Sequence, residues 1–381
     1  MKRSGLTAWL ATVRTPVAIC LAQRAALFLV VFLGMVMDRL VVEGTFRPLH
    51  NNFLLDGWLR WDSEHYYNIA RQGYQLLPNT LQQPTNFWPL YPLLLHTVQG
   101  YLGGPLFAGL IVSNLALLCS CVMLHRWVCR RFGKEVATRT ITLLLCFPFA
   151  FYFSAMYTES IFLLGAVGAF YFSQRNRWLL ASCCAAMAGG SRLVGVIVFV
   201  AVVLSYAERH RWRPATFGWD ALWLPVGLAG TLGYIWFLQY RFDDGFAFLR
   251  TQWVPGWGDN SSWSRLTVVA AGAFRWRRLV LGTIDAIALV NLAFGCLALL
   301  GCLVVFRRVG LAAGTWGIVT MLISLRIWAS AGRYAAVAWP MFLAGALLTE
   351  RRPNLYLGIV GAMSLLQSLL AVWFAHGHWV A

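Results

Sequence analysis

The residues best suited to catalysis are concentrated in one polar segment that follows the first long apolar run. Asp62, Glu64 and His65 stand within four consecutive positions there. A carboxylate in such surroundings can act as a general base and accept the proton of a hydroxyl nucleophile. Asp62 is therefore the candidate base, and Glu64 and His65 are candidates for contact with substrate.

The spacing of apolar residues around Asp62 predicts a short amphipathic helix. Trp58, Trp61 and Ile69 recur at helical spacing, and Gly73 is placed to end the helix. Such a helix would lie on the outer membrane surface with Asp62 at its N-terminus, where the helix dipole favours an ionised carboxylate. The alternative is that Asp62 only caps the helix and Trp61 anchors it at the interface.

A second aromatic stretch follows in the same polar region. Pro89 and Pro92 would rigidify the entry to another amphipathic helix, and Trp88 and Tyr91 lie between aromatic neighbours where substrate could pack. Equally, this stretch could be an aromatic anchor at the membrane interface.

Four further charged residues stand at junctions between apolar runs: Glu159, Arg192, Arg326 and Arg333. Glu159 follows a helix break at Pro148 and is either an N-cap or an acid of the site. Each arginine alone could extend to the membrane interface. All four map to the same membrane face as Asp62, a coincidence that a site requires and scattered anchors do not.

Membrane-spanning helices are needed to position these junctions, and the composition indicates that the chain contains many of them. The chain has 381 residues, 59% of them hydrophobic and 12% charged, whereas a soluble domain is about 45–50% apolar and about 25% charged. This excludes a disordered protein, a secreted disulfide scaffold and an ordinary cytosolic enzyme. Apolar runs such as 161–172 and 311–325 indicate an all-α polytopic membrane protein.

The net charge of +17 points to membrane orientation rather than to a nucleic-acid partner. No nucleic-acid motif accompanies the 31 Lys and Arg residues, and the bases gather in short loops, as expected for cytoplasmic loops. The basic N-terminal stretch with Arg14 and Arg24 is therefore placed in the cytoplasm. Contact with anionic membrane lipids is also expected.

We expect a bundle of about 11 transmembrane helices, with the C-terminus outside the cytoplasm. They are predicted at 25–42, 104–127, 140–156, 160–173, 178–191, 193–207, 221–240, 280–306, 309–327, 334–348 and 355–375. Several are shorter than the roughly 17 residues of a spanning helix, so tilted or broken helices are expected. A single membrane domain over residues 1–381 results, with outer loops at 43–103 and 241–279.

An ordered set of motifs resembles the PIG-V-type mannosyltransferases. In the first outer loop the motifs are Arg60-Trp61-Asp62, Ile69-Ala70-Arg71-Gln72-Gly73-Tyr74 and Phe87-Trp88-Pro89-Leu90-Tyr91-Pro92. Later in the chain they are Pro148 with Tyr157-Thr158-Glu159-Ser160, Gly190-Ser191-Arg192 with Gly195, and Arg333-Tyr334 with Pro340. The family usually has Thr at the position of Ser191 and often Phe at that of Trp88, and neither change removes a catalytic group.

The resemblance implies a GT-C glycosyltransferase, a bacterial relative of the enzyme that adds the second mannose of the GPI anchor. Such enzymes use a polyprenyl- or dolichyl-phosphate sugar on the extracytoplasmic side and carry a catalytic acid in the first outer loop, at the position of Asp62. Single displacement by a lipid or glycan hydroxyl would invert the anomeric configuration. Arg192, Arg326 and Arg333 would bind the donor phosphate, and Glu159 would be a second acid.

Substrate contacts are assigned to Arg60, Trp61, Glu64, His65, Trp88, Tyr91 and Tyr157. No strong metal-ligand set is visible, so neither a cofactor nor a divalent metal is predicted. The expected location is the bacterial plasma membrane with the site facing outward, or the endoplasmic reticulum membrane in a eukaryote. Two alternatives stay open: a transporter or flippase of lipid-linked sugars, and the same transfer with a different sugar.

Overall fold

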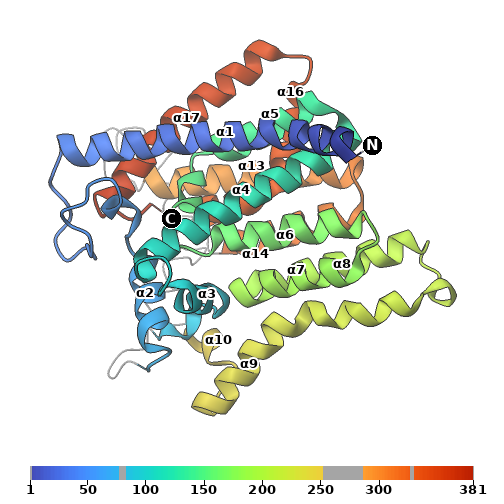
Figure 1. Ribbon diagram of the computed structural model, residues 1–381, viewed down its shortest axis with the longest axis horizontal. Coiled ribbons are helices and arrows are strands. Elements are labelled where there is room, and N and C mark those ends of the chain that lie inside the picture. The colour runs from blue at the N-terminus through green and yellow to red at the C-terminus, as the bar shows by residue number, and fades with distance from the viewer. Residues whose placement is uncertain (1, 77–82, 252–285, 327–329, 381) are drawn as a thin grey trace.

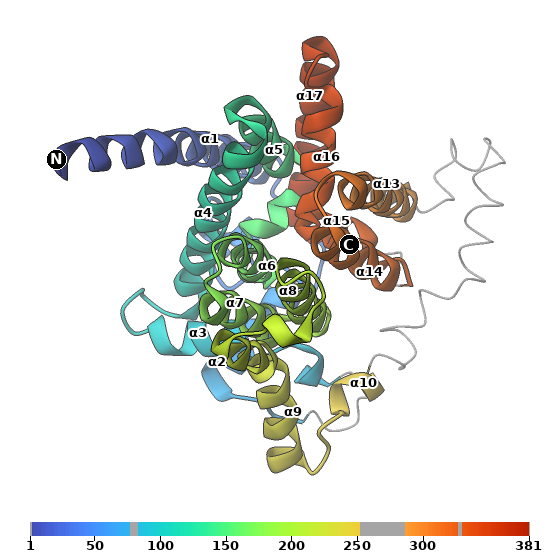
Figure 2. The same ribbon diagram turned by 90° about the vertical axis from the view of Figure 1, so that its right-hand side faces the viewer.

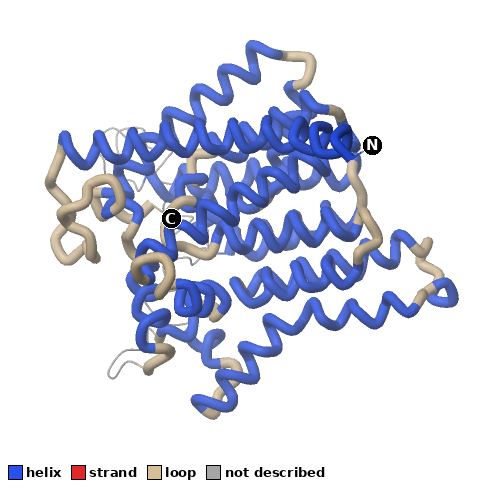
Figure 3. Tube along the Cα trace, viewed as in Figure 1, coloured by secondary structure: helices blue, strands red, loops and turns tan. Residues whose placement is uncertain are grey.

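The protein is helical throughout the part of the chain that the structure describes (Figure 3). The computed structural model describes residues 2–76, 83–251, 286–326 and 330–380, and these contain no β-strand. The longer helices are α1 (Lys2–Met37), α4 (Pro105–Phe132), α5 (Lys134–Cys146), α6 (Glu159–Ser173), α7 (Trp178–Ser191), α8 (Val196–Arg209), α9 (Ala229–Phe242), α13 (Ala286–Arg308), α14 (Leu311–Arg326), α16 (Trp339–Thr349) and α17 (Pro353–Ala375). The shorter ones are α2 (Asp62–Gln72), α3 (Leu90–Val98), α10 (Ala247–Thr251), α15 (Ala331–Val337) and the 3-10 segments η1 (Asp56–Trp58), η2 (Pro84–Asn86), η3 (Ala150–Phe153), η4 (Leu193–Gly195), η5 (Pro214–Thr216) and η6 (Trp219–Leu228).

Five of the described segments are long and apolar enough to cross a membrane: Val13–Met37, Pro105–Phe132, Trp219–Phe242, Ala286–Arg308 and Pro353–Ala375. Helices α15 and α16 form a sixth candidate, bent by 72° at a short break. The expected all-α membrane bundle with broken helices is thereby confirmed. The expected count of eleven spans stays a prediction, because helices such as α6, α7 and α14 are apolar but short.

Helix α5 is shorter than the sequence predicted, and Pro148 is the reason. The helix expected at 140–156 ends instead at Cys146, and Phe147 is extended with φ −60° and ψ 137°. A proline disfavours the helical conformation in the residue before it, and it has no N–H to continue the hydrogen-bond ladder. The chain then forms η3 before Glu159 opens α6.

The carbonyls freed by this break are satisfied by side chains of α1 and α17. Arg24 donates to the carbonyls of Leu145 and Ala150, both at 2.9 Å, and Gln367 donates to those of Leu145 and Phe147, also at 2.9 Å. Carbonyls without partners are costly inside a membrane, so these contacts stabilise the break. Arg24 is therefore no loop residue, contrary to the sequence-based placement: α1 starts long before position 25, and this side chain is buried in the bundle.

The bundle has two chemically different ends (Figure 1). At the end that we call the basic end, the N-terminus lies with the short arginine-rich loops that follow α4, α8 and α13. Contacts join these loops: Arg131 donates to the carbonyl of Val309 at 2.7 Å, and Glu208 accepts from the N–H of Leu311 at 3.0 Å. The opposite end, which we call the site end, carries α2, α3 and the C-terminus.

Both amphipathic helices expected in the first loop are present at the site end. Helix α2 ends at Gln72, directly before Gly73, whose φ of +73° is readily adopted by glycine, and α3 follows Pro89. The two helices are joined by a hydrogen bond of 2.8 Å between His96 Nδ1 and the carbonyl of Ala70.

The end of α17 and the segment 376–380 that follows it are hydrogen-bonded to the first loop. The N–H of Val42 donates to the carbonyl of His376 at 2.9 Å, and Arg60 Nε donates to that of Ala375 at 2.8 Å. His376 Nε2 also lies 2.9 Å from the carbonyl of Asp38. The first loop and the segment after α17, which are distant in sequence, thus lie side by side at the site end.

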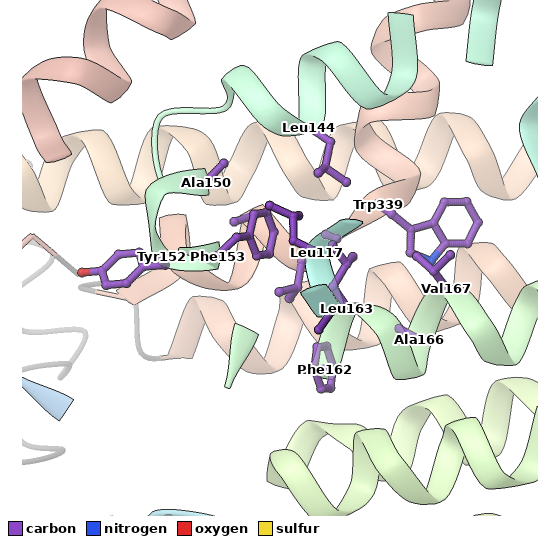
Figure 4. Close-up of a cluster of buried hydrophobic side chains, with 14 of the residues drawn as sticks. Leu117, Leu144, Ala150, Tyr152, Phe153, Phe162, Leu163, Ala166, Val167 and Trp339 are labelled. Carbon is purple, nitrogen blue, oxygen red and sulfur yellow. The ribbon is translucent and has the colours of Figure 1, made fainter. Parts of the chain in front are cut away.

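The hydrophobic core surrounds the broken segment between α5 and α6. Ala150 and Phe153 of η3 lie with Leu117 of α4, Leu144 of α5 and Leu163 of α6, whereas the ring of Tyr152 extends away from this group (Figure 4). In the second view, α1 and α17 diverge from the helices that enclose this core (Figure 2). The core therefore holds the chain in place on both sides of the break.

Candidate active site

Asp62 begins α2, and its carboxylate reaches a residue near the other end of the sequence. Asp62 Oδ2 accepts a hydrogen bond from Arg333 Nη1 at 2.7 Å. The Asp62 side chain is 20% exposed, whereas that of Arg333 is 8% exposed. Trp61 occupies the N-cap position of α2, and no side chain caps the helix there. The geometry therefore favours a charged site over the alternative in which Asp62 only caps α2.

Glu159 forms ion pairs with two arginines, and one of these, Arg333, also pairs with Asp62. Its Oε1 accepts hydrogen bonds from Arg192 Nη1 at 2.9 Å and from Arg333 Nε. The side chain is fully buried, and its Oε2 has no hydrogen-bond partner among the described residues. Thr158 holds the N-cap position of α6, so Glu159 does not act as that cap.

These four residues form one cluster, Asp62–Arg333–Glu159–Arg192, that contains two carboxylates and two guanidinium groups. Burying such charges is favourable only when each is paired, because desolvation of an isolated ion is costly. The charges balance, but the hydrogen bonding is incomplete at Glu159 Oε2. An unsatisfied buried oxygen next to a partly exposed carboxylate is unusual for a purely structural cluster.

Tyr157 sets the position of Asp62. Its hydroxyl donates to the carbonyl of Arg60 at 3.1 Å and accepts from the N–H of Asp62 at 3.2 Å. Its ring also lies 4.5 Å from the Arg333 guanidinium carbon, and that of Tyr152 lies at 5.3 Å. Tyr157 therefore holds the start of α2 and provides an aromatic face for the cation.

The position of Arg333 is fixed by its neighbour Gly332. The N–H of Gly332 donates to Asn291 Oδ1 at 3.0 Å, and a Cβ at this glycine would come within 2.3 Å of the Phe149 ring. Only a residue without a side chain fits there, so α15 packs closely against the segment after Pro148. This close packing brings Arg333 to Glu159.

His65 lies on α2, in the same helix as Asp62. Its ring stacks on Phe87 with centroids 4.4 Å apart and planes at 19°. Burial lowers the pKa of His65, and the nearby carboxylates of Asp62 and Glu64 oppose this only in part. A neutral imidazole at neutral pH can exchange hydrogen bonds with a sugar, but it adds no charge for phosphate.

Two further predicted substrate contacts, Arg60 and Tyr91, have their polar groups engaged by the protein. Arg60 is fully buried and donates to Asp56 and to the carbonyl of Ala375. Tyr91 is buried, and its hydroxyl contacts the carbonyl of Gly109 and Ser113 Oγ. We interpret Arg60 and Tyr91 as residues that hold the first loop in place.

Trp88 is also buried, away from the charged cluster. It packs against Tyr234 and Phe248, with ring centroids 4.9 Å and 5.3 Å apart. Glu64 is exposed on α2. Trp88 thus connects the first loop to α9 and α10.

Two predicted features lie wholly or mostly outside the described residues. Arg326 ends α14, but its side chain is not described, so its part in phosphate binding stays a prediction. Of the second outer loop at 241–279, only the beginning is described, up to residue 251. Within the described residues, no three His, Cys, Asp or Glu side chains are grouped to hold a metal, and metal independence stays a prediction.

Three contributors to the site were not predicted as such. Asn291 carries only the sequence pattern of an ordinary polar residue in a helix, Tyr152 is one of several aromatic residues before Glu159, and the segment 376–380 follows the last apolar run. Their contacts are with residues far along the chain, so no local signal could have identified them.

The sequence match supports the resemblance seen in the motifs. The family model described as Mannosyltransferase (PIG-V) matches residues 41–216, which include Asp62, Glu159 and Arg192. The matched part covers the first loop and the broken segment after α5. No protein of curated function is detectably similar in sequence.

Solved structures share the fold. ArnT from Cupriavidus metallidurans, bound to undecaprenyl phosphate, superimposes with a TM-score of 0.53 at 16% identity, over 93% of this chain and 69% of the ArnT chain. The apo state of the same protein gives a TM-score of 0.52 at 17% identity, over 95% of this chain and 63% of that chain. This chain therefore spans about two thirds of the length of ArnT. Such similarity shows that the fold is shared with ArnT and leaves the activity to the site residues.

Proposed function

Because residues 41–216 match the PIG-V mannosyltransferase family on a GT-C fold, we propose that this protein is a membrane glycosyltransferase that moves mannose from a polyprenyl-phosphate donor to an acceptor hydroxyl. The observation that carries the proposal is the contact of 2.7 Å between a partly exposed Asp62 and Arg333, within a cluster that also holds Glu159 and Arg192. A general base can deprotonate the acceptor hydroxyl, and guanidinium groups can stabilise the leaving lipid phosphate.

Asp62 accepts the proton of the acceptor hydroxyl as that oxygen attacks the anomeric carbon of the donor. A carbon–oxygen bond to the acceptor forms, and the bond between the anomeric carbon and the lipid-phosphate oxygen breaks. The polyprenyl phosphate leaves with the electron pair of that bond. Because one displacement takes place, the product has the inverted anomeric configuration.

Arg333 couples the proton transfer to the departure of the phosphate. In the resting cluster its charge is shared between Asp62 and Glu159. Protonation of Asp62 removes one of these negative charges at the moment when the leaving phosphate gains charge. Arg333 and Arg192 then stabilise the phosphate through charge-assisted hydrogen bonds, with Arg326 as a third contributor. Glu159, as the second acid, keeps both of its arginines in place.

The donor lipid and the location follow from the same observations. A relative in fold, ArnT, is described as bound to undecaprenyl phosphate, which supports a polyprenyl-phosphate donor here. The arginine-rich loops at the basic end favour a cytoplasmic location for that end. The site then faces outward, and the compact loops favour a bacterial plasma membrane.

The test is a transfer assay with the full chain in lipid nanodiscs. Labelled polyprenyl-phosphate mannose and polyprenyl-phosphate glucose are supplied separately with a panel of lipid and glycan acceptors, and NMR gives the anomeric configuration of the product. We expect transfer of mannose with inversion, unchanged by EDTA. Preference for glucose would refute the choice of donor sugar, retention would refute the single displacement, and loss of activity in EDTA would refute metal independence. Movement of the intact donor across the membrane without transfer would favour a flippase.

A further inference from the structure

Two partly exposed tryptophans pack together at the start of α2, the helix that Asp62 begins. Trp61 directly precedes it and is 39% exposed, and Trp379 of the segment 376–380 is 44% exposed. Their rings meet edge to face, with centroids 5.3 Å apart and planes at 83°. Segments from opposite ends of the sequence thus present aromatic surface next to the candidate base.

The backbone and the side chain of Trp61 are both constrained. Its φ of +53° is rare for a residue with a side chain, and such strained conformations are concentrated at functional sites. Its indole Nε1 donates to the carbonyl of His378 at 3.2 Å, which fixes the orientation of the ring. A tryptophan that only anchors a loop at the membrane interface needs neither feature.

Trp379 is held from the other side by a buried hydrogen bond. The carbonyl of Val380 accepts from Asn291 Nδ2 at 2.8 Å, and both residues are fully buried. The same asparagine accepts the N–H of Gly332, the neighbour of Arg333, at 3.0 Å. Asn291 therefore ties the exposed indole of Trp379 to the helix that carries Arg333.

We propose that Trp61 and Trp379 form a carbohydrate-binding platform that takes a hexose ring of the acceptor. The inference rests on the proposed function and makes the acceptor a glycan. A sugar ring has apolar C–H faces that pack on aromatic rings and hydroxyls that bond to carboxylates, so exposed indoles beside Asp62 match both surfaces. The acceptor lies here rather than the donor sugar, because the base must touch the acceptor while the arginines hold the donor phosphate.

A binding experiment tests this without relying on catalysis. The full chain in nanodiscs is titrated with the methyl α-glycosides of mannose, glucose and N-acetylglucosamine, and saturation-transfer NMR reports contact with the ring protons. We expect at least one glycoside to bind, and Trp379→Leu to raise its Kd about tenfold. Trp379→Phe keeps a ring and should stay within about threefold of the wild type. Trp236→Leu is the matched control, because Trp236 is 68% exposed on α9, outside the platform.

The possible results test the sugar-binding platform and the proposed transfer reaction independently. Equal affinity of the Trp379→Leu and wild-type proteins would overturn the platform, as would the absence of glycoside binding by the wild type. Because Leu and Phe are both apolar, loss in Leu alone shows stacking on a ring rather than a packing defect. Binding of labelled undecaprenyl phosphate, measured in the same preparations, should be unchanged by Trp379→Leu. Sugar binding without any transfer activity would refute the proposed function and leave the platform standing.

Discussion

Asp56 and Asp62 are both aspartates of the first loop that pair with an arginine, yet the surroundings of the two carboxylates differ. Asp56 is fully buried, and its carboxylate accepts from Arg47, from Arg60 and from the N–H of Leu49. Arg60 in turn is fully buried, with further hydrogen bonds to backbone carbonyls. We call this group the closed cluster.

The group Asp62–Arg333–Glu159–Arg192 is open by comparison. Asp62 retains 20% exposure, and Glu159 Oε2 lacks a partner among the described residues. Buried ions whose hydrogen bonds are complete hold a fold together, whereas those left incomplete can still accept a proton or a ligand. The two clusters share their residue types, and the completeness of the contacts distinguishes the structural cluster from the one suited to chemistry.

Asp62→Asn is expected to have the largest effect on the open cluster. Removing the base should lower the transfer rate about 10²–10⁴-fold, because the amide cannot accept the proton. Asn is similar in size and Asp62 is partly exposed, so the melting temperature in nanodiscs should change little. Transfer at the wild-type rate by a folded Asp62→Asn protein would show that Asp62 is not the base.

The matched change in the closed cluster is Asp56→Asn, and it should act on stability. It leaves Arg60 buried beside a neutral partner, which costs about 3–5 kcal/mol for a broken buried ion pair. The free energy of unfolding, from denaturant titration in mixed micelles, measures this loss. The transfer rate per folded molecule should stay near that of the wild type, and a fall like that of Asp62→Asn would remove the distinction between the two clusters.

Arg333→Lys changes the cation that joins the two carboxylates of the open cluster. Lysine keeps the charge but lacks the guanidinium fork that reaches both Asp62 and Glu159, so kcat/KM for the donor should fall about 10–100-fold. Arg47→Lys is the control, because Arg47 pairs with Asp56 at the closed cluster and is 27% exposed. Equal donor kinetics in Arg333→Lys and the wild type would count against a role in phosphate binding.

The smallest effect concerns His65 and pH. Because burial lowers its pKa, the unfolded chain takes up a proton on His65 before the folded chain does as the pH falls. The folded state therefore loses stability below about pH 6.5, the ordinary pKa of histidine, until the folded pKa is passed. His65→Phe keeps a ring on Phe87 but lacks this titration. The melting temperature of the wild type relative to His65→Phe should fall between pH 7.5 and 5.5, and a constant difference would contradict the buried neutral imidazole.

Much of the site was predictable because its parts have local signatures. Asp62 stands at the start of a helix that ends at Gly73, and Glu159 follows the break at Pro148, as their spacing indicated. Amphipathic period and proline sterics act over a few residues, so they can be read along the chain.

Other assignments could not be made locally. Arg24 looked like a loop residue because a charge interrupts an apolar run, but its guanidinium caps the carbonyls of Leu145 and Ala150, more than a hundred positions later. Arg60 belongs to the same motif as Asp62, and only its hydrogen bonds place it in the closed cluster.

The membrane class, the helical fold and the candidate base could be predicted from the sequence, since composition and short-range periodicity reflect solvation and backbone geometry. Which charges meet depends on the packing of the helices. Arg333 reaches Asp62 across 271 positions and Trp379 reaches Trp61 from the segment after α17. Such contacts depend on how the helices pack, because a charge on a helix carries no local mark of the partner that it will find.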